Sequence, residues 1–235
     1  KEIEILIQEA QKAGEENLTE NSTVAAVKKA EEALSAVTKD VQALVNNSAE
    51  LETLKTSIAD AKNKELAANG IITIKESIPY DAVVIINDAD ENTAKTLEEI
   101  LSADKKAELK NAFTLEKYKI AADGSIENWD TELTAVLQCK EDIGEKQVYI
   151  LQKTDVFNKT KEVASTTNYL QAVVEGQNVT FKMDQDGAYA FGVAAVASTD
   201  NNNQNDNNQN SNGTSGTTSG TTGGTSTTGT VATGS

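Results

Sequence analysis

The chain has 235 residues, a formal net charge of −16 and neither histidine nor arginine. Such an acidic chain lacks the basic patches that bind phosphates, which argues against nucleic acid as a partner. Without histidine it can build neither Ser-His-Asp nor Cys-His catalysis, nor a histidine-ligated zinc site. We therefore expect a protein that is not an enzyme, with no catalytic, cofactor-binding or metal-binding residues.

Residues 1–68 carry the pattern of three amphipathic helices. Apolar side chains recur three and four positions apart in stretches that begin at Ile3, Val24 and Leu51. Polar residues interrupt the pattern near Asn17 and again before Ser48, which is a suitable N-cap for the third helix. The pattern predicts a small antiparallel three-helix bundle.

Residues 69–197 change from helical spacing to the alternation of β-strands. One helix is expected within this region, over residues 93–111, where leucines again recur at helical spacing. Short strands separated by turn residues favour a mostly antiparallel β-sandwich with one helical insertion. The expected strands are Ile71–Ile74, Ala82–Ile86, Phe113–Ala121, Glu132–Cys139, Gln147–Gln152, Tyr169–Glu175, Asn178–Met183 and Ala188–Ala195.

The last segment, Ser198–Ser235, consists almost entirely of Ser, Thr, Gly, Asn and Gln. It has too few apolar side chains to offset the entropy of ordering, so we expect a disordered tether. The chain opens on Lys1 rather than methionine, and we read it as an internal piece of a longer protein. No apolar run is long enough to span a bilayer, and a tether implies an anchor to the cell envelope beyond Ser235. The expected fold is thus α+β and multidomain.

One short motif resembles a calcium-binding loop. Asp88, Asp90 and Asn92 alternate, and Glu99 occupies the twelfth position. However, Thr93 stands where such a loop needs glycine, and a strand rather than a helix precedes the motif. We therefore expect a turn and a helix N-cap at this position, with negative charge at the N-terminus of the helix.

Two further side-chain sets were considered for function. Cys139 ends an apolar strand pattern and has no second cysteine to pair with, so a buried structural thiol is expected. Trp129 together with Tyr118 or Tyr149 would form a sugar-stacking platform if their rings were exposed in a row. With so few aromatic residues in the chain, we expect them mainly in the core.

The end of the β region resembles a known bacterial module. The stretch from Glu175 to Val196 reads EGQNVTFKMDQDGAYAFGVAAV and is similar to the last hairpin of a β-sandwich module common in cell-wall-anchored proteins of low-GC Gram-positive bacteria. The matching residues are Gly176, Val179, Thr180, Phe181, Asp184, Tyr189 and Ala190. The chain departs from the module at Gln185–Gly187, where relatives often carry His-Phe-Ser.

The resemblance covers roughly Phe113–Ala197, with YKIAADGSIENW and KQVYILQ similar to earlier strands of the module. Residues 1–65 more loosely resemble three-helix repeats of the same class of surface proteins. Together these likenesses imply a non-catalytic stalk or spacer in a secreted protein that is extracellular and associated with the cell wall. The alternative is an accessory module, possibly carbohydrate-binding, of an extracellular polysaccharide-degrading enzyme. Neither reading identifies a protein or glycan partner.

Overall fold

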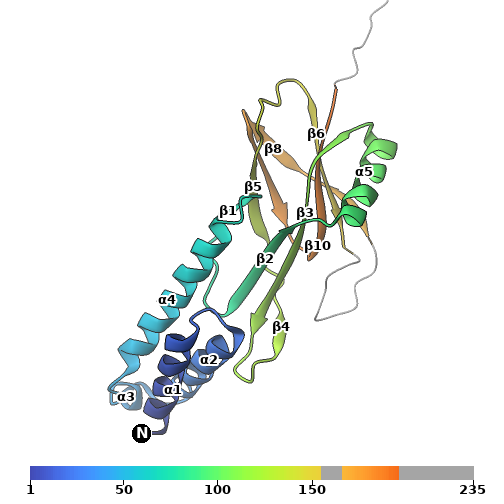
Figure 1. The fold of residues 1–235 in the computed structure, drawn as a ribbon. Coiled ribbons are helices and arrows are strands. Elements are labelled where there is room, and N and C mark those ends of the chain that lie inside the picture. Colours follow the sequence, from blue (N-terminus) through green and yellow to red (C-terminus); the bar gives the residue numbers. More distant parts are fainter. Residues whose placement is uncertain (155–165, 196–235) are drawn as a thin grey trace, which may run out of the picture. The chain divides into compact units, whose positions relative to one another are not determined.

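A computed structural model describes residues 1–154 and 166–195. N-terminal helices pack together and are followed by two antiparallel sheets with one further helix (Figure 1). This is the α+β class predicted from the sequence. The predicted tether, Ser198–Ser235, lies outside the described residues, and Lys1–Ala197 forms one compact unit.

The predicted helices are present, with one short addition. The N-terminal region contains α1 (Glu2–Glu16), α2 (Asn21–Ser35), α3 (Lys39–Gln42) and α4 (Ser48–Ala67). The single-turn α3 lies in the connection between α2 and α4 and was not expected. Ser48 is the first residue of α4 rather than its cap; Asn47 holds the N-cap position and makes no capping hydrogen bond through its side chain.

The strands form two sheets that are antiparallel throughout. The four-stranded sheet has the order β1-β5-β9-β8, and the six-stranded sheet has the order β2-β3-β10-β6-β7, with β4 paired to β3. The strand bounds are β1 (Thr73–Ile74), β2 (Ala82–Asp88), β3 (Glu108–Ile120), β4 (Ile126–Asn128), β5 (Leu133–Gln138), β6 (Gln147–Lys153), β7 (Thr167–Leu170), β8 (Ala172–Glu175), β9 (Asn178–Met183) and β10 (Gly187–Ala194).

The two sheets share an apolar core, as a sandwich requires. Alternate residues of β3 and β10 point inward, and the rings of Phe113 and Tyr189 stack with centroids 5.4 Å apart. From the four-stranded sheet, Leu133 and Phe181 enter the same core and are almost fully buried. The period of two in these strands therefore corresponds to one face turned toward the opposing sheet.

The opposite face of β10 is covered by helix α5 (Glu91–Lys105). That face carries Ala188, Ala190, Gly192 and Ala194, whose small side chains leave room for the helix. A Cβ added to Gly192 would lie 3.0 Å from Leu101 Cδ1. Strand β10 is consequently buried on both sides, with aromatic residues toward the sandwich and small residues toward α5.

The helix predicted over residues 93–111 extends too far at its C-terminal end. Helix α5 ends at Lys105, and Lys106 takes the left-handed conformation with φ +54°. The Ala107 N–H then donates to the Leu101 carbonyl at 3.3 Å, which closes the last turn. Residues 108–111 belong to β3 because they pair with β10, a long-range partner that helical spacing cannot reveal.

The predicted strand Tyr169–Glu175 is two strands in two different sheets. β7 pairs with β6 in the six-stranded sheet, whereas β8 pairs with β9 in the four-stranded sheet. The predicted tight hairpin follows β8: Glu175 lies opposite Asn178, and Gly176 has φ +61°. A positive φ at this position is what a two-residue hairpin loop demands, and glycine adopts it without strain.

The N-terminal helices pack on the outer face of the six-stranded sheet. Tyr80, Tyr118 and Ile120 of the sheet region lie in one apolar cluster with Ile7, Val27 and Leu51 of the helices. On β3, Tyr118 and Ile120 at even positions face the helices, and Phe113 and Leu115 at odd positions face the sandwich. The helices and the sheet therefore share a continuous core.

Candidate functional site

The described residues with the most unusual environment lie where the helices meet the start of β2. Asp81 is buried there, and its carboxylate lies 3.0 Å from Lys28 Nζ of α2 and 3.3 Å from Lys119 Nζ of β3. Burial opposes ionisation of Asp81, but the hydrogen bond and charge of Lys28, aided by Lys119, outweigh it. The pKa of Asp81 therefore lies below its ordinary value.

Tyr80, the preceding residue, continues this polar cluster. Its hydroxyl donates to the Glu31 carboxylate, which also pairs with Lys55 Nζ of α4 at 2.7 Å. Burial and the neighbouring Glu31 carboxylate raise the pKa of Tyr80 well above its ordinary value. The Nζ atoms of Lys28 and Lys55 lie 5.9 Å and 5.5 Å from the centre of the Tyr80 ring, within cation–π range.

Lys62 of α4 binds the main chain of the same segment. Its Nζ donates to the carbonyl oxygens of Tyr80 at 2.7 Å and Ala82 at 2.9 Å. Burial lowers the pKa of Lys62 to about 8, although the nearby Asp81 carboxylate favours the charged form. The neighbouring Asn63 amide exchanges two hydrogen bonds with the main chain of Ile78. Together these contacts clamp α4 onto the segment that enters β2.

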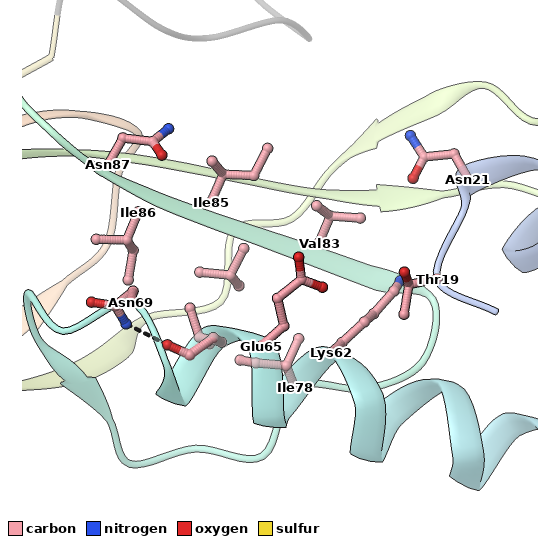
Figure 2. A pocket seen from close by; sticks show the side chains of 12 residues that line it. Thr19, Asn21, Lys62, Glu65, Asn69, Ile78, Val83, Ile85, Ile86 and Asn87 are labelled. Carbon is pink, nitrogen blue, oxygen red and sulfur yellow. Dashed lines mark hydrogen bonds between the residues drawn. The ribbon is translucent and has the colours of Figure 1, made fainter. Parts of the chain in front are cut away.

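A groove of about 330 Å³ runs beside this clamp, between α4 and β2. Figure 2 shows Lys62 and Glu65 extending from α4 toward β2, with Asn69 at the end of the helix. We call it the β2 edge groove. It is lined by Thr19, Asn21, Lys62, Glu65, Leu66, Asn69, Ile78, Val83, Val84, Ile85, Ile86 and Asn87.

The residues of the calcium-like motif behave as a helix start. The Asp90 carboxylate accepts a hydrogen bond from the Thr93 N–H at 3.0 Å and another from the Thr93 hydroxyl at 2.8 Å. These two bonds lower the pKa of Asp90. Asp90 is the N-cap of α5, and Asp88 ends β2. Within residues 1–154 and 166–195, no group of three or more acidic or cysteine side chains is arranged to hold a metal ion.

The aromatic residues considered as a sugar platform lie in three separate clusters. Trp129 packs partly buried against the sandwich core, whereas Tyr118 is buried against the helices. Tyr149 packs edge-to-face with Tyr169 beneath α5, and Lys105 Nζ lies 4.6 Å from the Tyr169 ring centre. The structure therefore does not bring Trp129 together with either tyrosine.

Cys139 is half-buried and packs against the sandwich core. Burial raises the pKa of its thiol, which disfavours the reactive thiolate. It lines a second pocket of about 330 Å³, with Lys110 and Lys140 among its neighbours there. The thiol is therefore less buried than expected, and its structural role stays a prediction.

The Asp81 cluster and the β2 edge groove were missed by sequence reasoning. One signal was available: Lys62 falls on the apolar stripe of α4, four residues after Ile58 and four before Leu66. A lysine on an apolar stripe needs a buried acceptor, which here is the main chain of Tyr80 and Ala82. The partners of that lysine lie in a different element and could not be read from spacing.

Comparison with known proteins places the chain in no family. No protein-family model matches it, and neither a curated protein nor a solved structure is significantly similar. Among the helices described, none is long and apolar enough to cross a membrane.

Proposed function

We propose that this chain is a non-catalytic spacer of a secreted bacterial surface protein, which holds a functional domain away from the cell envelope. The observation that carries the proposal is the junction between the helices and the six-stranded sheet. A shared apolar core and the buried Asp81 cluster join them. Two structural regions that share an apolar core do not move independently of each other. A spacer needs this rigidity, because only a rigid protein can hold another domain at a fixed distance.

The proposed location follows from the sequence. The resemblance of Phe113–Ala197 to a wall-protein module supports an extracellular, cell-wall-associated protein that reaches the envelope through a C-terminal anchor. The net charge of −16 favours a well-hydrated protein surface and disfavours contact with anionic lipid surfaces. The absence of histidine and arginine supports a non-catalytic role.

Rigidity at the junction can be measured directly. In a Cys139→Ser background, spin labels at Lys12→Cys and Val173→Cys report the distance between α1 and β8. A spacer predicts a single narrow distance distribution. Asp81→Asn is the matched loosening variant and should broaden it. A broad distribution in the parent protein would contradict a rigid junction.

Location and binding need a separate experiment. Antibodies against residues 1–197 should label intact cells of the source organism, and surface proteolysis should remove the signal. A glycan array probed with the full chain should show no tight binding. Micromolar binding to one polysaccharide class, lost in Trp129→Ala, would instead favour the accessory-module function.

A further inference from the structure

Strand β2 is an edge of the six-stranded sheet, and within the described residues the outward main-chain groups of Val84 and Ile86 have no hydrogen-bond partner. The Ile120 N–H donates to the Asp81 carbonyl at 2.8 Å, so Asp81 and the odd positions after it bond to β3. In an antiparallel ladder the intervening residues then direct their N–H and C=O groups away from that partner. The outward residues of β2 include Ala82, Val84 and Ile86.

The outward groups differ along the strand. At the start of β2, Lys62 donates to the carbonyls of Tyr80 and Ala82, and the Ala82 N–H donates to the Pro79 carbonyl. Farther along, no hydrogen bond from the described part of the chain reaches the outward groups of Val84 or Ile86. By the register of the ladder, these two donors and two acceptors point toward the β2 edge groove, which both residues line.

The groove also has a defined chemical character. Leu66, Ile78 and Ile86 supply apolar surface, while Glu65 extends from α4 with an exposed carboxylate (Figure 2). The Glu65 carboxylate makes no ion pair or hydrogen bond within the described residues. The lysine of the groove, Lys62, is already committed to two main-chain carbonyls. The available charge in the groove is therefore negative, as is that of the whole chain.

We propose that the β2 edge groove binds an extended peptide segment of a partner protein, which adds to β2 as a further strand and places a basic side chain beside Glu65. Main-chain hydrogen bonds to Val84 and Ile86 supply affinity, and the groove selects side chains at alternate positions. This inference does not depend on the spacer function.

The spacing of the unpaired groups favours a peptide over other ligands. Val84 and Ile86 repeat every second residue, and only an extended backbone presents matching donors and acceptors at that interval. The lining from Val83 to Asn87 spans roughly 16 Å at about 3.3 Å per residue, which accommodates a short strand. The net charge of −16 adds long-range attraction for a basic segment.

The experiment follows amide exchange in the full chain by NMR. The probe is a blocked synthetic peptide of about eight alternating valine and lysine residues, which is longer than the groove. Before addition, the amides of Val84 and Ile86 should exchange fast, while those of Val83 and Ile85, bonded to β3, should be slow. At millimolar peptide, exchange at Val84 and Ile86 should slow at least about tenfold, because their N–H groups become hydrogen-bonded.

Three controls separate the parts of the proposal. A peptide N-methylated at alternate backbone nitrogens should not protect Val84 and Ile86. Replacing each lysine of the probe by glutamate should weaken binding about tenfold. Glu65→Gln should weaken the lysine peptide about threefold to fivefold, whereas Glu98→Gln, on the distant helix α5, should leave its Kd unchanged.

Several results would overturn the proposal. One is a lack of protection at Val84 and Ile86, or protection confined to the β7 or β8 edges. Equal affinity for the lysine and glutamate peptides would contradict the preference for a basic ligand. Slow exchange at Val84 and Ile86 before peptide is added would mean that the edge is already paired. If that slow exchange disappeared on dilution, the occupant of the edge would be a second copy of the chain. If it disappeared on deletion of residues 196–235, the occupant would be this chain's own C-terminal segment.

Discussion

The Lys28 ammonium lies 3.0 Å from the Asp81 carboxylate and joins helix α2 to the residue that precedes strand β2. Lys119 approaches the same carboxylate oxygen at 3.3 Å from β3. The buried Asp81 carboxylate thus links helix α2 to strand β3, two elements that lie far apart in the sequence. Because the Asp81 carboxylate is buried, although both lysines stay partly exposed, losing its charge costs more than losing a surface carboxylate.

Asp81→Asn should destabilise the folded unit by about 2–4 kcal/mol. The substitution removes the buried negative charge, so that Lys119 loses its counter-ion among the described residues and Lys28 keeps only Glu31, at 3.6 Å. Urea unfolding followed by circular dichroism measures the change. Asp60→Asn, at an exposed position of α4, is the control and should stay within about 0.5 kcal/mol of the parent. Equal effects of the two substitutions would contradict a structural role for the Asp81 cluster.

Lys62 should make stability rise with pH in the alkaline range. Its pKa is about 8 in the folded protein and 10.5 as an ordinary lysine. Between these values the unfolded chain binds more protons, so raising the pH favours the folded state. The free energy of unfolding of the parent should therefore gain about 1–2 kcal/mol relative to Lys62→Met between pH 7 and 10.

Comparing the parent with the variant removes the contributions of other groups that titrate in this range. The exposed neighbour Lys64 provides the control, because Lys64→Met should keep the parent's pH dependence. If Lys62→Met and the parent changed in parallel from pH 7 to 10, burial would not be lowering the pKa of Lys62.

Gly187→Ala should be among the most damaging single substitutions in the sandwich. Gly187 has φ +152°, and an added Cβ would lie 2.3 Å from the Lys153 carbonyl oxygen, which belongs to the backbone of β6. We expect a loss of about 3 kcal/mol or more. Gly144→Ala is the matched control, since Gly144 has φ +58° but open space around it. It should lose only about 1 kcal/mol, from backbone strain alone. Thermal unfolding of both variants separates the steric clash from the strain.

Asp90→Ala should lower the Tm through loss of the α5 cap, with or without calcium. Asp88→Ala, which changes an exposed residue outside the cap, should have little effect. Thermal melts of the parent with and without millimolar calcium should coincide. A ligand at 100 times its Kd adds about 2.7 kcal/mol, so a binding site would be visible. A calcium-dependent rise in Tm that Asp90→Ala abolishes would establish a metal site here.

The local pattern of the sequence determined most secondary structure. Apolar residues at helical spacing located α1, α2 and α4, and alternation located β5, β6, β9 and β10, because each pattern reports which face a segment buries. The turn at Gly176 was equally local, since glycine chemistry alone selects a two-residue hairpin. The same local reasoning predicted a turn and an N-cap among Asp88, Asp90 and Asn92, and the structure assigns the cap to Asp90.

Only the tertiary structure decided the features that depend on distant partners. Residues 108–111 keep helical spacing, yet they form a strand because β10 supplies their hydrogen bonds. The strand predicted over Tyr169–Glu175 divides between two sheets for the same reason. The Asp81 cluster and the edge at Val84 and Ile86, unpaired within the described residues, arise where α2, α4, β2 and β3 meet. Spacing along the chain states which side of an element is buried, but not which element covers it, and both the clamp and the groove depend on that second choice.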